Sequence, residues 1–385
     1  MTAPRDFPEI RDGVAALCKQ FPGEYWRDLD AQKQYPTAFV EALTEAGYLA
    51  TLIPEQYGGS GLPLAAACAV LEEIHASGGN GGACHAQMYT MGTVLRHGSD
   101  AQKDTYLPQI ASGALRLQAF GVTEPGSGTD TSRITTRARR EGDDYVVSGQ
   151  KVFISRAEHS DLMVLLVRTS DRDTTTKHTD GMSVLLVDMR EALGNGLTIQ
   201  PISTMMNHAS TQLFFDELKV PVTNLVGQEG DGFRCILDGM NAERILIAAE
   251  CIGDARYFVR TASEYARERR VFDRPIGRNQ GVQFPIARAL VQTEAAALMV
   301  QRAASLYDAG EPAGAEANMA KLLASEAAWN AADTCIQTLG GWGFATEYDV
   351  ERKFRETRLY QVAPISTNLI LSHIATRVLD LPRSF

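Results

Sequence analysis

The stretch FGVTEPGSGTD, residues 120–130, carries the most information about fold and function. It is a polar turn that lies between an apolar run and a region of short β-branched segments. Its two glycines, Gly126 and Gly128, allow the backbone close approaches that a side chain would block. Three hydroxyls stand beside main-chain N–H groups, those of Thr123, Ser127 and Thr129. Such a loop can bind a polar heterocycle or a thioester tail, and the alternative is an ordinary hairpin or strand-entry turn.

Around this loop, the whole chain has the composition of an ordinary globular enzyme. Its 385 residues suffice for several domains or one large multilayer unit, with 44% hydrophobic and 22% charged residues. The net charge of −10 argues against nucleic acid and membrane surfaces as partners, because phosphate-rich partners need a basic field. Six cysteines without a CxxC pair indicate reduced, buried thiols, so we expect a cytoplasmic protein.

Targeting segments and metal sites are not expected either. The first residues, MTAPRDFPEIRDG, include acidic side chains and no apolar core segment, so we expect no signal peptide. No unbroken apolar run reaches ~18 residues, so we expect no membrane span. His75, His85 and His97 are spaced too widely for a metal site, and we expect no bound metal.

Three blocks follow one another along the chain, and together they predict an α+β protein. Residues 1–115 are expected to be helical, since apolar residues recur at helical spacing in AFVEALTEAGYLA and LAAACAVLEEIHA. Residues 116–226 contain short runs such as YVVSGQKVFIS, DLMVLLVRT and MSVLLVDM, which predict a β domain. Residues 170–180 would form a long hairpin loop in it. Residues 227–385 contain long Ala-rich periodic segments, which predict a helical bundle.

Five segments in this order resemble the acyl-CoA dehydrogenase flavoproteins. They are FGVTEPGSGTD at 120–130, YVVSGQKVFIS at 145–155, NAERI at 241–245, YARERRVFDRPIGRNQ at 265–280 and QTLGGWGFATEYDVERKFRETRLYQ at 337–361. The resemblance covers nearly the whole chain, and the joint order of the segments is far more specific than any one of them. It implies an N-terminal helical domain, a middle β-barrel or sandwich domain and a C-terminal four-helix bundle. No GxGxxG or GxxxxGK motif occurs, so no Rossmann or P-loop site competes with this interpretation.

The resemblance implies that the protein binds FAD. Val122 and Thr123 match positions that contact the flavin ring, and Phe153 and Ser155 match residues that cover the ring and hydrogen-bond to it. For Phe153 the alternative is an ordinary place in a strand core. The remaining FAD positions implied by the resemblance are Thr129, Arg269, Phe272, Gln280, Gln337, Gly340, Gly341, Ser366 and Asn368, the last two within an altered motif.

Some of these FAD contacts come from a neighbouring subunit in the family. The resemblance assigns Arg269, Phe272 and Gln280 to this group, with the arginine near the pyrophosphate, an anion that suits a guanidinium. The alternative for the run RERR is an exposed, solvated helix face. The resemblance therefore implies at least a dimer, and in this family usually a homotetramer.

The family oxidises acyl-CoA thioesters to trans-2-enoyl-CoA. A carboxylate takes the α-proton while the β-hydrogen leaves as hydride to flavin N5, and the electrons pass on to an electron-transferring flavoprotein. Thr129, Arg244 and His85 are expected to contact the acyl-CoA, with His85 near one wall of the acyl pocket. The chain has no large C-terminal extension of the kind seen in acyl-CoA oxidases, which favours a protein acceptor over oxygen.

Glu243 of NAERI is the predicted base. The commonest place for the base in the family is a glutamate in a YEGT tail motif, but this tail reads LYQVAPIST and has Pro364 there. A subset of the family that includes isovaleryl-CoA and long-chain dehydrogenases carries the base at the position of Glu243. The alternatives are a structural carboxylate buried against an arginine, and Glu250, one heptad on, as a rival base.

The helical pattern around Glu243 agrees with this assignment. Glu243 lies within one apolar face of its helix, at i+3 from Met240 and i−4 from Ile247. Ile236 and Cys251 continue the same face. Neither residue 239 nor residue 247 is basic, so no i,i+4 ion pair explains the carboxylate. Partial burial is therefore expected to raise the pKa of Glu243 toward the range of a general base.

Pro364 also removes a hydrogen-bond donor. In the family, the main-chain N–H at this position binds the thioester carbonyl together with the flavin ribityl 2′-hydroxyl, and proline has no N–H. The loss of such a donor typically costs roughly 3–4 kcal/mol of transition-state stabilisation. Either Ile365 or Ala363 donates instead, or the thioester is held differently. Two further functions stay open: a different flavin or non-redox reaction on an acyl thioester, and a non-catalytic acyl-CoA or FAD-binding protein.

Overall fold

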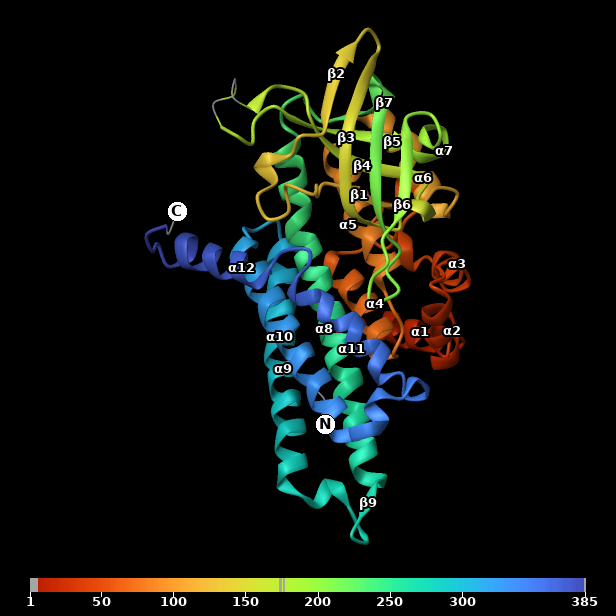
Figure 1. Ribbon diagram of the computed structural model, residues 1–385, viewed down its shortest axis with the longest axis vertical. Coiled ribbons are helices and arrows are strands. Elements are labelled where there is room, and N and C mark those ends of the chain that lie inside the picture. The colour runs from red at the N-terminus through yellow and green to blue at the C-terminus, as the bar shows by residue number, and fades with distance from the viewer. Residues whose placement is uncertain (1–5, 173–174, 176, 384–385) are drawn as a thin grey trace. The chain divides into compact units, whose positions relative to one another are not determined.

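The computed structural model describes residues 6–172, 175 and 177–383, and the chain divides into two compact units. The first contains Lys33–Leu62 and Gly82–Met240, and we call it the sheet unit. The second contains the chain up to Gln32, Pro63–Gly81 and the chain from Asn241 onward, and we call it the helical unit. Figure 1 shows the strands and the long helices of these units. Mixed helices and strands confirm the α+β class, whereas the boundaries at residues 115 and 226 stay predictions.

The sheet unit is built on one mixed sheet, in which the described residues form eight strands. Seven strands follow the order β6-β7-β3-β2-β4-β5-β8, and β1 pairs with β4. The β1–β4 and β2–β4 pairs are parallel and the other pairs are antiparallel. The strand bounds are Leu117–Gly121 for β1, Arg137–Glu141 for β2, Asp144–Ser155 for β3, Leu162–Arg168 for β4, Met182–Asp188 for β5, Leu197–Pro201 for β6, Ser210–Pro221 for β7 and Leu225–Val226 for β8.

The apolar runs LMVLLVR and MSVLLVD form the central strands β4 and β5, which are buried on both faces. Leu162, Val164 and Leu166 pack into the core on one face of the sheet, together with residues from the helices. Met163 and Leu165 pack into a second core with β3, β6 and β7. Burial on both faces explains why these runs are continuously apolar rather than alternating. β4 and β5 pair antiparallel, from Arg168 opposite Met182 to Leu162 opposite Asp188, which confirms the predicted hairpin. Residues 173, 174 and 176 of its loop lie outside the described residues.

The sheet unit also contains helices. They are α3 (Thr37–Glu45), α5 (Gly82–His97), α6 (Asp100–Ser112), the short α7 (Met189–Ala192) and the first turns of α8 (Gly232–Glu268). α6 begins with a capping box, in which the Ser99 hydroxyl accepts from Gln102 N–H and the Gln102 side chain accepts from Ser99 N–H. This reciprocal pair satisfies two backbone donors and fixes where α6 starts.

The helical unit contains the long helices predicted for the C-terminal part of the chain. Besides most of α8, it has α1 (Pro8–Cys18), α2 (Gly23–Gln32), α4 (Leu64–Ala76), α9 (Gln280–Asp308), α10 (Gly314–Leu339), α11 (Val350–Arg358) and α12 (Thr367–His373). Figure 1 shows α8, α9 and α10 running side by side. Buried alanines such as Ala296, Ala303, Ala320 and Ala324 line α9 and α10, and their small side chains let the helices pack closely.

A two-stranded hairpin, β9 (Arg270–Val271) and β10 (Arg274–Pro275), connects α8 to α9. Its two turn residues, Phe272 and Asp273, both have positive φ, the geometry of a tight hairpin turn. The six cysteines are buried and free, as expected for reduced thiols. Across the described part of the chain, every helix is too short or too polar to cross a membrane.

Candidate functional site

The loop at residues 120–130 begins where β1 ends, and its centre is a tight turn. Glu124 and Ser127 form an isolated antiparallel bridge, with N–H···O distances of 3.2 and 3.0 Å. An added Cβ at Gly126 or Gly128 would meet open space, so both glycines border solvent or a ligand. Ser127 is buried, and its Oγ donates to the Asp130 carbonyl at 2.6 Å, so this hydroxyl is bonded within the turn.

A buried ion pair holds this loop against β3. Lys151 Nζ donates to Glu124 Oε1 at 2.9 Å and to the Val122 carbonyl at 3.1 Å, and the lysine side chain is fully buried. The Glu124 carboxylate also accepts from the N–H groups of Thr135 at 2.7 Å and Thr136 at 3.0 Å. Burial alone raises the pKa of Glu124, but Lys151 and these hydrogen bonds outweigh it and lower that pKa. Lys151 therefore fixes the backbone of Val122, a predicted flavin contact.

Phe153 does not lie in the strand core, so that alternative is wrong. The residue is 63% exposed, and its φ is 57° at a point where the β3–β7 register shifts between Val152 and Ile154. Such a bulge turns one residue away from the regular alternation. An aromatic residue with positive φ is strained, and strain of this kind clusters at ligand sites. The geometry supports Phe153 as a ring that covers a flat ligand.

The other predicted residues of the sheet unit surround this loop. Val122 and Thr123 are half-buried, Thr129 is exposed, and the Thr123 carbonyl accepts from Val152 N–H at 2.9 Å. This backbone bond brings the loop next to the Phe153 strand. Ser155, half-buried, ends β3 opposite Ser210 of β7.

An aromatic chain starting at His85 adjoins the end of β1. His85 of α5 is buried and stacks on Tyr89 at 5.5 Å between ring centroids, and Tyr89 meets Phe120 edge-on at 5.3 Å. Phe120 is the first residue of the 120–130 loop. This arrangement supports His85 as part of an apolar wall next to the loop.

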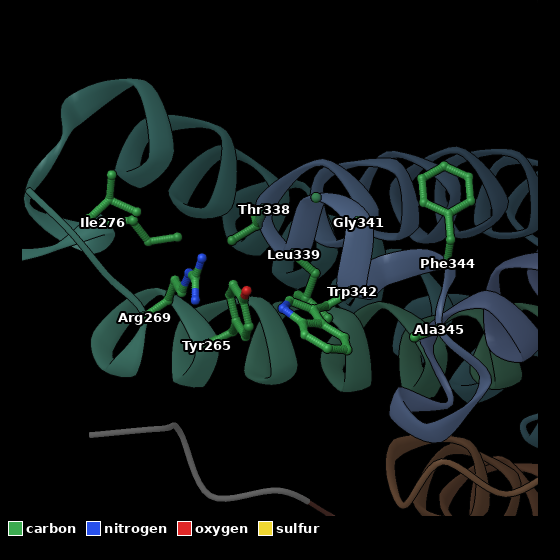
Figure 2. Close-up of a pocket in the computed structure, with 11 residues that line it drawn as sticks. Tyr265, Arg269, Ile276, Thr338, Leu339, Gly341, Trp342, Phe344 and Ala345 are labelled. Atoms are coloured by element: carbon green, nitrogen blue, oxygen red, sulfur yellow. The ribbon is translucent and has the colours of Figure 1, made fainter.

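The helical unit has a pocket of about 730 Å³ at the end of α8 and α10. It brings together two segments that are far apart in the sequence, because Arg269, Gly340 and Gly341 all line it. In Figure 2, Tyr265 and Arg269 rise from the end of α8 toward Thr338 and Gly341, and Trp342 lies beside Tyr265. Gly340 has φ 61° at the C-terminal end of α10, and an added Cβ at either glycine would meet open space. The guanidinium of Arg269 suits an anionic group of a ligand, and the glycines leave room for a flat ring next to the backbone.

The remaining predicted residues of the helical unit lie outside the lining of this pocket. Phe272 lies in the β9–β10 turn and is 92% exposed as a residue. Gln280 and Gln337 are exposed at the start of α9 and near the end of α10. Ser366 is the N-cap of α12, where its Oγ accepts from Leu369 N–H at 3.3 Å, and Asn368 is exposed. This N-cap hydrogen bond explains Ser366 structurally, independently of any contact with FAD. Their roles toward FAD stay predictions.

Glu243 lies on α8 and is buried, with only 6% of the residue exposed. This confirms that Glu243 is buried, as the helical pattern predicted. The neighbouring Arg244 donates from Nη1 to Asn241 Oδ1 at 2.9 Å. Burial lowers the pKa of Arg244, and the charge of Glu243 opposes this shift, so the two groups are close enough to interact. The base role of Glu243 stays a prediction.

Glu250, the rival base, has a different environment. It is completely buried, and its Oε1 lies 3.7 Å from Nε2 of His75. His75 in turn contacts Asp254 at 2.8 Å, and Lys353 contacts the same aspartate at 2.6 Å. Glu250 therefore belongs to a buried network of charges, which gives this carboxylate a structural explanation.

Three residues near these candidates were missed by sequence reasoning: Glu124, Lys151 and Lys321. Lys321 of α10 is fully buried and donates to the Ile365 carbonyl at 2.7 Å. A signal for it exists in the sequence, since Lys321 interrupts the face on which Ala317, Ala324 and Ala328 are buried. For Glu124 and Lys151 the signal is weaker, because nothing in one sequence pairs two charges 27 positions apart.

The residues of both units fit FAD. The open backbone at Gly126 and Gly128 and the exposed ring of Phe153 suit a flat heterocycle in the sheet unit. In the helical unit, the exposed guanidinium of Arg269 next to open glycines suits a pyrophosphate and an adjacent ring system.

Comparison with known proteins gives the same family along the whole chain. The models of the N-terminal, middle and C-terminal domains of acyl-CoA dehydrogenase match residues 5–114, 119–218 and 230–379. The chain is 35% identical over 379 residues to the acyl-CoA dehydrogenase FadE12 of Mycobacterium tuberculosis. The aligned region covers 98% of this chain and 96% of that protein.

Solved structures agree with this result. The acyl-CoA dehydrogenase of Geobacillus kaustophilus superimposes with a TM-score of 0.92 at 28% identity, over 99% of this chain and 100% of the other. A chain in the structure reported for the electron transferring flavoprotein of Acidaminococcus fermentans gives a TM-score of 0.91 at 28% identity, over 98% and 99% of the two chains. These matches confirm the resemblance seen in the sequence. The chain belongs to the acyl-CoA dehydrogenase family, the FAD-dependent oxidoreductases that act on acyl-CoA thioesters.

Proposed function

We propose that this protein dehydrogenates a saturated acyl-CoA at the α,β-bond, with Glu243 as the base that takes the α-proton. Bound FAD supplies the hydride acceptor for the β-hydrogen. The observation that carries the proposal is the burial of Glu243 on the apolar face of α8, beside Arg244. A desolvated carboxylate is a stronger base than an exposed one. Thr129 and His85 are proposed to contact the acyl-CoA in the sheet unit, and Arg244 in the helical unit.

The test is anaerobic reduction of the purified holoenzyme by saturated acyl-CoA thioesters. A panel of straight and branched chains, from butyryl-CoA and isovaleryl-CoA to palmitoyl-CoA, covers the range of acyl pockets in one experiment. At least one member is expected to bleach the flavin absorbance and release the trans-2-enoyl-CoA. Tight FAD binding without bleaching by any member would contradict the proposal.

A second candidate is a non-redox or different flavin reaction on an acyl thioester. Pro364 favours it, since the position that carries a thioester donor in the family has no N–H here. This candidate predicts acyl-CoA binding without flavin bleaching. The same panel, followed by product analysis, separates the two.

Lys151 is proposed to hold the flavin loop, and Lys151→Met tests this. The variant leaves the buried Glu124 without its ammonium and the Val122 carbonyl without its donor. Removing one partner of such a buried pair typically lowers the free energy of unfolding by about 3–5 kcal/mol. Only the part of this loss that comes from a displaced loop weakens the binding of FAD. We expect FAD to bind about 10–100-fold more weakly to the apoprotein, measured by quenching of flavin fluorescence.

Lys219→Met is the matched control for this prediction, because Lys219 is exposed on the neighbouring strand β7. It is expected to leave the Kd for FAD unchanged. If Lys151→Met lowered Tm but bound FAD as tightly as the wild type, the ion pair would support only the sheet.

We propose that the protein forms a homotetramer. An apolar stripe on α9 supports assembly: Phe284, Val291 and Leu298 recur every seven residues and are 59%, 68% and 68% exposed. A regular stripe of this size marks an interface between chains rather than a free surface. Exposed Arg269 and Phe272 would then reach the FAD of a neighbouring subunit.

Val291→Lys with Leu298→Lys is expected to disrupt this assembly, because two charges would have to be buried in the interface. Light scattering after size exclusion should give a smaller species than the wild type. Glu311→Lys, an exposed charge change just beyond the end of α9, is the control and should leave the mass unchanged. A tetramer that survives the double substitution would exclude the α9 stripe from the interface.

We further propose that an electron-transferring flavoprotein accepts the electrons and that the enzyme is cytoplasmic. The similarity to a chain in the electron transferring flavoprotein structure of Acidaminococcus fermentans supports the first point. The six buried free thiols support the second. Reduction of a purified electron-transferring flavoprotein by the acyl-CoA-reduced enzyme tests the acceptor.

A further inference from the structure

The tail segment around Pro364 leaves one backbone donor unused. It lies between the turn at Leu359–Gln361 and α12. The Ala363 N–H already donates to the Leu359 carbonyl at 2.9 Å, and Pro364 has no N–H. Ile365 therefore carries the next available donor. The backbone hydrogen bonds among the residues that the structure describes do not include one from the Ile365 N–H.

Lys321 fixes this residue from the opposite side. Its Nζ donates to the Ile365 carbonyl at 2.7 Å, and both residues are buried, Lys321 at 0% and Ile365 at 7% exposure. A buried ammonium with a short hydrogen bond has little freedom, so the orientation of the Ile365 backbone is fixed with it. A lysine in an alanine-lined face is costly to bury and needs a reason.

Lys321 also lies in the electrostatic field of the proposed base. Burial and the charge of Arg244 lower the pKa of Lys321 to about 8, against the charges of Cys251 and Glu243, which raise it. The three groups come from α8 and α10, within the helical unit. The tail residue that Lys321 holds is thus tied to the surroundings of Glu243.

We propose that the Ile365 N–H donates to the thioester carbonyl oxygen in place of the donor that Pro364 lacks, and that Lys321 is the positioning residue that holds Ile365 for this contact. The inference rests on the proposed dehydrogenation. As the α-proton leaves, negative charge develops on the thioester oxygen, and a fixed N–H stabilises that charge. Removal of one such donor typically lowers kcat by about 10²–10³-fold.

The test compares Lys321→Met holoenzyme with the wild type, using 3-thiabutyryl-CoA and 3-thiaoctanoyl-CoA as non-oxidisable probes. A 13C label at the thioester carbon isolates its C=O stretch in infrared difference spectra. The wild type is expected to shift this stretch to lower frequency, and Lys321→Met to reverse most of the shift. The apparent pKa of the α-proton of the bound probe should rise in the variant. It is measured from the long-wavelength absorbance that appears when the enolate forms next to oxidised flavin.

Two further variants keep the test decisive. Ser325→Ala lies one turn along α10, is equally buried, and loses only a bond within its own helix, to the Leu322 carbonyl at 3.1 Å. It should retain the wild-type carbonyl frequency. Lys321→Gln retains a neutral hydrogen-bond donor, and it replaces Lys321→Met in the test if that variant does not retain FAD. It should reverse only part of the shift in the carbonyl frequency.

The outcomes separate this inference from the proposed function. A wild-type carbonyl shift that persists unchanged in Lys321→Met and Lys321→Gln would overturn the inference, even if the enzyme oxidises acyl-CoA. A shift that depends on Lys321, in an enzyme whose flavin no saturated acyl-CoA bleaches, would support the thioester site and contradict the proposed dehydrogenation.

Discussion

Glu243→Gln is expected to abolish flavin bleaching by a saturated acyl-CoA while FAD stays bound. Glutamine has nearly the shape of glutamate, but its amide does not accept the α-proton. General base catalysis is worth about 10²–10⁴-fold, so the rate of flavin reduction should fall by that factor. Anaerobic stopped-flow absorbance measures the rate, and the flavin-to-protein ratio shows that FAD is retained.

Glu250→Gln is the matched control, because it makes the same change one heptad along the same helix. Glu250 lies next to His75 in the buried charge network, so its loss should affect Tm more than flavin reduction. A variant Glu243→Gln that still bleaches its flavin at the wild-type rate would exclude Glu243 as the base. Loss of bleaching in Glu250→Gln alone would transfer that role to Glu250.

Local patterns predicted the elements of the fold. The continuous apolar runs became β4 and β5, and the Ala-rich periodic segments became α9 and α10, since burial and close packing leave direct marks on composition. The positive φ of Phe153 could not be predicted in this way, because a bulge depends on the register between β3 and β7. Register is a property of two strands, and one strand's sequence does not specify it.

The candidate site was predicted only where a residue acts through its own segment. The burial of Glu243 followed from the face of a single helix. The Lys151–Glu124 pair and the Lys321–Ile365 bond join segments that are 27 and 44 positions apart, and such pairing appears only when the chain has folded. Arg269 and the glycines at 340 and 341 were brought together by resemblance, and the pocket now gives that grouping a geometric basis.

Asp254→Ala is expected to lower the free energy of unfolding by about 3–5 kcal/mol, the typical cost of breaking a buried ion pair. Asp254 is fully buried and accepts from Lys353 Nζ at 2.6 Å, His75 Nδ1 at 2.8 Å and Thr357 Oγ1 at 2.6 Å. The variant leaves the Lys353 ammonium inside the helical unit without its nearest carboxylate, and Glu356 at 3.2 Å offsets only part of that loss. We expect Tm to fall by about 5–10 °C, measured by calorimetry.

The same aspartate gives the protein an acid-sensitive step. Burial alone raises the pKa of Asp254, but Lys353 and His75 outweigh burial and lower it below its ordinary value. A carboxyl with a lowered folded pKa contributes stability above its unfolded pKa of about 3.9, and this stability is lost as the pH falls through the folded pKa. Below about pH 4, Tm should therefore fall more steeply in the wild type than in Asp254→Asn, which has no carboxyl to titrate.

Glu294→Ala is the control for both measurements, because Glu294 is a 56% exposed side chain paired with Arg256 at 3.3 Å. An exposed pair contributes at most about 1 kcal/mol, and Arg256 keeps Glu72 as a second partner. Its Tm should stay near that of the wild type at every pH. If Asp254→Ala were no less stable than Glu294→Ala, the buried network would be neutral for folding. Its charges would then have to be explained by the placement of α8, the helix that carries Glu243, rather than by stability.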